Sequence, residues 1–294
     1  MNPQAKKLSD IALNASLNSK IKKNPAVKPF LKWAGGKTNV ISEIIPHVPP
    51  LKKGCCYWEP FVGSGALFFT LKPPKAVLSD VNYKLIECYK AVRENPETIY
   101  DLLCNHFEKH SKDHFYKTRA EFNCMNDKFT QASRFIYLNK AGFNGLYREN
   151  KLGEFNVPFG RKTKPSFPTL DELKQISTLL SAVDLLPTSF ENITNKIKKN
   201  DFVYLDPPYT VMHKNNGFIK YNAKLFSWND QETLKHFMDT LTARGAKVLI
   251  SNASHESIKA LYDGYEIIEI SRTTCISANK EFRTSINEFL IKNY

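Results

Sequence analysis

Short apolar runs alternate with longer amphipathic segments in two parts of the chain. In the first part, 57–61 is predicted to be a strand, an apolar helix is predicted from Ala66, and 76–79 is predicted to be a strand ending at Asp80. A strand, a glycine turn, a helix and a second strand in that order open a doubly wound α/β sheet. In the second part the same patterns predict helices at 170–180, 231–243 and 257–262 and strands at 201–205, 247–250, 265–270 and 286–291.

The segment between these two parts has a different pattern. Residues 83–129 are mostly polar helix, 133–138 continue as helix, and 142–168 hold closely spaced glycines and prolines that favour a loop. We therefore predict one α/β domain formed by 29–83 and 169–294, with an insertion at 84–168. Residues 1–28, rich in Asn, Ser and Lys, are predicted to be a basic mobile tail.

The distribution of charge adds a candidate partner. The formal net charge is +13, and residues 134–164 hold seven Lys and Arg residues against Glu149 and Glu154. Clustered positive charge favours a polyanion, with nucleic acid first and an acidic membrane surface second, although many basic proteins bind neither. No apolar run is long enough for a transmembrane helix. The six cysteines have no disulfide-like or metal-binding spacing, so we expect a reduced, cytoplasmic compartment.

The glycine turn after the first predicted strand is a candidate cofactor site. Its residues are Phe-Val-Gly-Ser-Gly at 61–65, and Gly63 and Gly65 would let the backbone approach a ligand closely. Position 68 is Phe, so the third glycine of a dinucleotide site is missing and a smaller nucleoside cofactor fits better. Asp80, at the end of the next strand, is placed to accept hydrogen bonds from a ribose. The nearby Gly35-Gly36-Lys37-Thr38 is no P-loop, because Leu31 stands where that motif needs glycine.

Asp206-Pro207-Pro208-Tyr209 follows the apolar run at 202–205 and is the second candidate site. Two prolines hold a stiff, extended turn, so the Asp206 carboxylate and the Pro207 carbonyl can both accept hydrogen bonds in one pocket. These two acceptors match the two N–H groups of an exocyclic amine, and Tyr209 can stack on the base. A base in a duplex must be flipped out to reach such a pocket. The alternative is an ordinary Asp-Pro turn that ends a strand.

Six stretches, with their order and spacing, carry a family resemblance. The chain resembles the Dam-type DNA adenine methyltransferases from Pro29 to its last residue. The resemblance implies a Rossmann-like methyltransferase sheet, with 84–168 as an inserted, mainly helical target-recognition domain. The stretches are PFLKWAGGK at 29–37, EPFVGSG at 59–65, SDVN at 79–82, LNKAGFNGLYR at 138–148, EFNVPFGR at 154–161 and YLDPPY at 204–209.

The resemblance also implies the cofactor S-adenosylmethionine and the residues that bind it. Lys37 would meet the methionine carboxylate, and Trp33 would pack near the sulfonium as a cation–π neighbour. The catalytic residues would be Asp206, Pro207 and Tyr209. The expected cofactor residues are Trp33, Lys37, Phe61, Gly63, Gly65, Asp80 and Asp206.

Double-stranded DNA is the implied partner, and GATC is the implied target. Arg148 is the residue that we expect to read guanine through a bidentate hydrogen bond, with Tyr147 beside it as a stacking or wedging residue. The alternative for any single arginine here is a surface salt bridge. Positively charged neighbours, including Lys162 and Lys164, would contact phosphates. The expected DNA-binding residues are Lys140, Asn144, Arg148, Arg161, Asn279 and Arg283.

Three alternatives stay open. A cytosine-N4 enzyme commonly has Ser at the position of Asp206, an RNA adenine methyltransferase would not need a DNA-like insertion, and an inactive relative would not need intact site residues. A cognate restriction endonuclease that shares the target site is a further candidate partner. His106, His110 and His114 recur at helical spacing, but they span two turns and cannot share one ion. We expect no metal there, and a face that points to solvent or DNA.

Overall fold

A computed structural model of the chain describes residues 27–124, 127–210, 226–273 and 285–294. Within these residues the chain forms a seven-stranded sheet in the order β3-β2-β1-β4-β5-β7-β6. Neighbouring strands from β3 to β5 are parallel, and β7 runs antiparallel to both β5 and β6. The strands are β1 (Tyr57–Glu59), β2 (Ala76–Asp80), β3 (Val183–Pro187), β4 (Phe202–Leu205), β5 (Lys247–Ala253), β6 (Glu266–Thr273) and β7 (Ser285–Lys292).

Helices cover both faces of the sheet, so its central strands are buried on both sides. On β4, Phe202 and Tyr204 join the core on one face, whereas Val203 and Leu205 join the core on the other, because successive side chains alternate. The first core is completed by α2 to α8 and the second by η4, α10 and α11. The helices are α2 (Ile41–Ile44), α3 (Ala66–Leu71), α4 (Tyr83–Glu94), α5 (Pro96–Glu108), α6 (Lys112–Phe122), α7 (Lys128–Ala141), α8 (Leu170–Leu180), α10 (Trp228–Ala243) and α11 (Glu256–Leu261), with the 3₁₀ turns η1 (Lys37–Asn39), η2 (Ile45–His47), η3 (Phe143–Gly145) and η4 (Phe190–Lys196).

The polar helix predicted at 83–129 is divided into three helices, and residues 125–126 are outside the described part. Asn82 caps α4 by accepting a hydrogen bond from the Leu85 amide. The side chain of Asn95, followed by Pro96 at the first helical position, ends α4 and begins α5. Ser111 then caps α6. Cap residues inside a charged sequence therefore mark boundaries that periodicity alone did not show.

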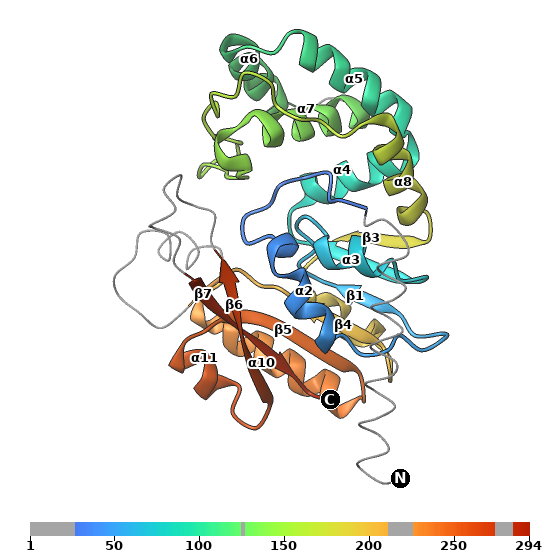
Figure 1. The fold of residues 1–294 in the computed structure, drawn as a ribbon, viewed down its shortest axis with the longest axis vertical. Coiled ribbons are helices and arrows are strands. Elements are labelled where there is room, and N and C mark those ends of the chain that lie inside the picture. Colours follow the sequence, from blue (N-terminus) through green and yellow to red (C-terminus); the bar gives the residue numbers. More distant parts are fainter. Residues whose placement is uncertain (1–26, 125–126, 211–225, 274–284) are drawn as a thin grey trace.

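Figure 1 shows α5, α6 and α7 gathered at one end of the molecule, with α4 and α8 between them and the sheet. The helix α4 contacts β2 and β3 as well as α7, and one hydrophobic core runs from the sheet into the helical layer. The expected boundary at residue 84 therefore falls at the start of α4, a helix that belongs to a shared core. The division into a catalytic domain and a target-recognition domain stays a prediction.

The doubly wound α/β sheet predicted from the sequence is confirmed, with some differences in its elements. The strand β3, with sequence VDLLP, was not predicted, because Asp184 is exposed and interrupts the apolar run. The predicted strand at 57–61 is shorter, since the glycine turn begins after Glu59. Nearly all of the expected basic tail, residues 1–26, lies outside the described residues. In the described part of the chain, no helix is long and apolar enough to span a bilayer.

Candidate active site

The predicted site residues meet at the carboxyl ends of the parallel strands. The glycine turn follows β1, Asp80 ends β2, and Asp206 follows β4 directly. The strand order reverses between β1 and β4, because β1 connects to β2 on one side and β4 to β5 on the other. Open α/β sheets bind their ligands at such a switch point, outside the carboxyl ends of the strands. The fold therefore brings the two sequence motifs to the same edge.

The glycine turn has a backbone that side-chain-bearing residues rarely adopt. Gly63 and Gly65 have φ angles of +45° and +67°. A Cβ atom on Gly63 would lie 2.6 Å from Cδ1 of Trp33, so the indole packs directly on this glycine. The Gly63 amide donates to Oδ2 of Asp80 at 3.2 Å, and the Tyr89 hydroxyl donates to the Gly63 carbonyl at 3.0 Å. Trp33, Gly63 and Asp80 thus form one connected surface.

Asp80 is partly buried, and burial raises the pKa of its carboxyl to about 6. Hydrogen bonds from the amides of Asn82 and Gly63 act in the opposite direction, because they stabilise the charged form. The carboxylate is therefore ionised and able to accept hydrogen bonds at neutral pH. Its titration lies close enough to neutrality to be measured.

Asp206 forms an ion pair with a buried lysine. The Lys37 ammonium lies 2.7 Å from Oδ1 of Asp206 and donates to the Gly35 carbonyl at 2.8 Å. The Lys37 side chain is 3% exposed and that of Asp206 is 18% exposed. Removing either partner of such a pair is costly, because the remaining charge would be buried without compensation. Lys37 therefore holds the carboxylate in place while one side of Asp206 still meets solvent.

A second carboxylate in the same cluster was not identified from the sequence. Glu288 on β7 is 1% exposed, and its Oε2 lies 3.9 Å from the Lys37 ammonium. The same oxygen accepts a hydrogen bond from the Tyr209 hydroxyl at 2.9 Å. The Lys37 ammonium also lies 4.9 Å from the centroid of the Tyr209 ring. The sequence held one signal of its burial. Glu288 lies two residues before the buried Leu290 in the strand sequence INEFLIK, so both side chains point to the same face of the sheet.

Glu59 is a third buried acid near this cluster. It is 3% exposed and accepts a hydrogen bond from the Tyr57 hydroxyl at 2.8 Å. Burial raises the pKa of Glu59 to about 8, and the negative charge of Asp206 acts in the same direction. Asp206 and Glu288 thus surround Lys37 with Glu59 close to Asp206, and the neutral form of Glu59 reduces the repulsion between these acids.

The other predicted cofactor residues lie around this centre. The Phe61 ring is partly buried against Phe190 and Phe226, at centroid distances of 5.4 and 5.8 Å. Trp33 is partly buried, and Pro207 is buried directly after Asp206. The Lys37 ammonium points toward Asp206 and holds that carboxylate. The expected contact of Lys37 with a cofactor carboxylate stays a prediction.

The predicted DNA-binding residues lie mainly on residues 142–161, which we call the 142–161 hairpin. Its two arms meet through isolated bridges between Gly142 and Phe159 and between Glu149 and Phe155. Asn144, Arg148 and Arg161 are all exposed on it, as contact with DNA requires. The Arg148 Nε donates to Oδ1 of Asn156, across the hairpin, at 2.7 Å.

Two other expectations for this surface need qualification. Lys140 is partly buried, and burial lowers its pKa to about 8, with the nearby charges of Lys32 and Lys162 acting in the same direction. It remains largely charged at neutral pH, in a cluster of three lysines. Asn279 and Arg283 lie outside the described residues.

Tyr147 does not project from the hairpin as a wedge. Its ring stacks between Trp33 and Phe135, at centroid distances of 5.5 and 5.3 Å, and its hydroxyl donates to Glu149. The large apolar side chains that the hairpin does expose are Phe143, which is 50% exposed, and Leu152, which is 82% exposed. Neighbouring positions in the sequence did not show which aromatic ring faces outward.

The histidine row also differs from its expected exposure. A break between α5 and α6 puts His106 on one helix and His114 on the next, where their Nδ1 and Nε2 atoms lie 2.9 Å apart. His106 stacks on Tyr137, and His110 contacts the Tyr137 hydroxyl at 3.0 Å. All three rings are partly buried. The row therefore packs the helical layer together instead of facing solvent.

Comparison with known proteins gives a consistent assignment. Residues 33–276 match the model of the D12 class N6 adenine-specific DNA methyltransferases. The chain is 39% identical over 287 residues to the Type II methyltransferase M.MjaIII of Methanocaldococcus jannaschii, covering 91% of this chain and 99% of that protein. It is 35% identical over 276 residues to the Type II methyltransferase M1.LlaDCHI of Lactococcus lactis, with 91% and 96% coverage.

A third relative is the DNA adenine methylase of Salmonella typhi, which is 34% identical over 272 residues, covering 92% of this chain and 95% of that protein. These matches run through both the sheet and the helical layer. They support the DNA adenine interpretation over the cytosine-N4 and RNA alternatives. The family match, the strand order and the clustered motif residues agree, and the chain belongs to the D12 class of N6 adenine-specific DNA methyltransferases.

Proposed function

We propose that the chain transfers a methyl group from S-adenosylmethionine to adenine N6 in duplex DNA at GATC-like sites, after the base has been flipped out. The observation that carries the proposal is the meeting of the glycine turn with Asp80 and of Asp206 with Lys37 at one edge of the sheet. Residues 84–168, which include the 142–161 hairpin and the helices α5 to α7, would form the target-recognition domain. Methyltransferases of this family generally use S-adenosylmethionine.

The residues at the glycine turn fit that cofactor. The absence of a Cβ atom on Gly63 leaves room for the Trp33 indole, and a ligand at this turn would meet an aromatic face. Asp80 supplies an ionised acceptor for ribose hydroxyls at neutral pH. When bound, the cofactor would supply an electrophilic methyl group on a positively charged sulfonium. An aromatic ring close to that charge is favourable through a cation–π interaction.

The second motif would bind and activate the adenine. The Asp206 carboxylate has two oxygens, each with two lone pairs, so the ion pair through Oδ1 does not exhaust its capacity as an acceptor. Asp206 and the Pro207 carbonyl would accept the two N–H groups of the adenine amine and localise its lone pair on nitrogen. The Tyr209 ring, held by Glu288 at its hydroxyl, would stack on the base.

The proposed function is tested with the purified protein, S-adenosylmethionine carrying a labelled methyl group, and plasmid DNA. We expect label on adenine N6, and direct sequencing of the modified plasmid should locate it at GATC. Replacing adenine by 2-aminopurine in a short duplex should give a rise in fluorescence on binding, because a flipped base is unstacked. Methylation at a different sequence would reject the GATC assignment, and the absence of any adenine methylation would reject the proposed chemistry.

A cognate restriction endonuclease is part of the proposal, because two of the relatives are named Type II methyltransferases. A methyltransferase in such a system makes its host's DNA resistant to an endonuclease of the same specificity. Plasmid DNA from cells that express the chain should therefore resist cleavage by an endonuclease that cuts the unmethylated target. Complete cleavage of fully methylated plasmid would argue against this role.

Cofactor affinity should depend on pH through Asp80. Its pKa is raised to about 6, so the Kd for S-adenosylmethionine should be lowest above pH 7 and rise as the pH falls through 6 and the acceptor becomes protonated. Stability should change in the opposite sense, because a carboxyl with a raised pKa in the folded state destabilises that state as the pH rises from about 4 to 6. Calorimetric titration from about pH 5 to 8 measures the Kd, and thermal melts from about pH 4 to 8 measure the stability.

Asp80→Asn provides the control for this prediction. The amide keeps one acceptor oxygen but cannot titrate, so its affinity should be lower at neutral pH and nearly constant between pH 5 and 8. A variant that retains the full pH dependence would show that another group is responsible.

Arg148→Ala should relax target recognition without affecting the chemistry. A bidentate arginine–guanine contact discriminates against a wrong base pair by about 1–3 kcal/mol, so preference for the cognate duplex should fall by roughly 5- to 150-fold. The measurement is kcat/KM on the cognate duplex and on duplexes with one altered base pair outside the adenine. Lys140→Ala, if that residue contacts phosphate, should instead weaken binding to all duplexes alike.

A further inference from the structure

The 142–161 hairpin is attached to the cofactor-binding segments on two sides. On the first side, the Tyr147 ring stacks on Trp33 at 5.5 Å with an interplanar angle of 20°, and Trp33 packs on Gly63 of the glycine turn. Buried Asn139, at the end of α7, accepts from the Lys32 amide at 2.9 Å and donates to the Lys32 carbonyl at 2.8 Å. The loop that carries Trp33 is thereby tied to the start of the hairpin.

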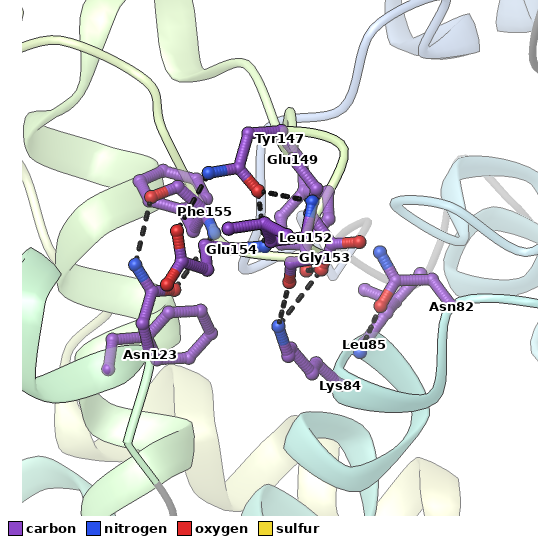
Figure 2. Close-up of polar contacts among 12 residues, drawn as sticks. Asn82, Lys84, Leu85, Asn123, Tyr147, Glu149, Leu152, Gly153, Glu154 and Phe155 are labelled. Carbon is purple, nitrogen blue, oxygen red and sulfur yellow. Dashed lines mark hydrogen bonds and ion pairs between the residues drawn. The ribbon is translucent and has the colours of Figure 1, made fainter.

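On the second side, a lysine of α4 reaches the end of the same arm and the turn of the hairpin. The Lys84 ammonium lies 2.9 Å from Oε1 of Glu149 and donates to the Gly153 carbonyl at 3.0 Å, as Figure 2 shows. The same Glu149 oxygen accepts from the Tyr147 hydroxyl at 2.5 Å. Lys84 follows Asn82, which caps α4 and whose amide donates to Asp80. The second anchor therefore begins beside the carboxylate of the cofactor site.

These contacts form a continuous chain that includes both sequence neighbours of Arg148. Gly63 contacts Trp33, Trp33 stacks on Tyr147, Tyr147 donates to Glu149, and Glu149 pairs with Lys84. Arg148 lies between Tyr147 and Glu149 in the chain, so both of its neighbours are anchored. An arginine that reads a base through two parallel hydrogen bonds tolerates little displacement, because the geometry of both bonds must be met at once.

We propose that Tyr147, Glu149 and Lys84 are positioning residues that determine sequence specificity by fixing Arg148 relative to the active site. This proposal rests on the proposed function, in which Arg148 reads a base. Lys84 and Glu149 are about one-third exposed, so their ion pair alone contributes little to stability. In this proposal the ion pair fixes the position of the hairpin, and losing even a weak contact can shift the hairpin relative to the active site.

The proposal is tested through the specificity ratio, defined as kcat/KM on the duplex methylated fastest divided by kcat/KM on a duplex with one altered base pair outside the adenine. The fastest duplex is identified by sequencing methylated plasmid, without assuming a target. Lys84→Met should lower the ratio by about 5- to 20-fold, because it removes both hydrogen bonds that hold the hairpin to α4. Lys84→Arg should retain most of the ratio, because it keeps the charge and the donors.

Lys128→Met is the matched control. Lys128 forms an exposed ion pair with Glu94 that joins α7 to α4 away from the hairpin, and the substitution changes the net charge equally. Its specificity ratio should equal that of the unsubstituted protein. The Kd for S-adenosylmethionine and the melting temperature should be similar in Lys84→Met and Lys128→Met, which separates positioning from folding.

A double variant tests the route through Arg148. If Lys84 acts by placing Arg148, then Lys84→Met combined with Arg148→Ala should have the same ratio as Arg148→Ala alone. Equal loss of activity on all duplexes in Lys84→Met would overturn the proposal and assign Lys84 to phosphate contact. An unchanged ratio in Lys84→Met, with a lowered ratio in Arg148→Ala, would reject the positioning role of Lys84 and keep the role of Arg148. An unchanged ratio in Arg148→Ala would reject the proposed role of Arg148 itself.

Discussion

Replacing Asp206 by alanine is expected to lower kcat for methyl transfer by about 10²- to 10⁴-fold, the order contributed by positioned acid–base and electrostatic groups. The carboxylate is 18% exposed and pairs with Lys37 at 2.7 Å, so it is held firmly yet accessible to a substrate. Single-turnover transfer of labelled methyl groups measures the effect, because this design separates the chemical step from product release.

Asp206→Asn keeps the size of the side chain and one acceptor oxygen, and its loss of activity should be smaller than that of alanine. Asp239→Asn is a matched control, since Asp239 pairs with Lys235 on the surface of α10. Activity of Asp206→Ala within threefold of the unsubstituted enzyme would exclude this carboxylate from the chemistry. A loss confined to cofactor affinity would reassign it to binding.

Lys37→Met should be the most destabilising substitution in the site. It leaves the Asp206 and Glu288 carboxylates close together without the cation between them. Removal of one partner from a buried ion pair costs about 3–5 kcal/mol, which corresponds to a fall in Tm on the order of 10 °C for a chain of this size. Differential scanning calorimetry measures the shift, and methyl transfer should be lost in the same variant.

Two further variants make this prediction specific. Combining Lys37→Met with Glu288→Gln removes one of the two uncompensated charges and should recover part of the Tm. Lys292→Met breaks a more exposed pair, between β7 and Glu266 on the edge strand β6, and should shift Tm by less than 3 °C, because such pairs contribute at most about 1 kcal/mol. Equal effects of Lys37→Met and Lys292→Met would show that the cluster is not electrostatically coupled.

The parts of the site that sequence reasoning identified are those in which the chemistry is local. Gly63 needs a positive φ and close approach, and the Asp206-Pro207 turn follows an apolar strand directly. The sheet was predictable for the same reason, because the spacing of apolar residues within each segment indicates whether it is a strand or a helix. The family resemblance then supplied the cofactor and the substrate, which local patterns left open.

The features that were missed depend on contacts between distant segments. Glu288 reaches Lys37 only because β7 runs antiparallel beside β5, so that its early residues lie at the edge where the parallel strands end. The exposure of His106 was misjudged because the helix ends before His110 and a second helix folds back. The packing of Tyr147 could not be predicted because burial on the hairpin depends on Trp33, a residue from another part of the chain.

The position of β7 also bears on how an active molecule first arises. Lys37 comes early in the chain and Glu288 is on the last strand of the described fold, so their contact has a very large sequence separation. Contacts of this kind require closure of a long loop and tend to form late. A nascent chain can therefore bring Gly63 and Asp80 together before the charge cluster exists. The role that we propose for this charge cluster in methyl transfer would therefore begin only once β7 has joined the sheet.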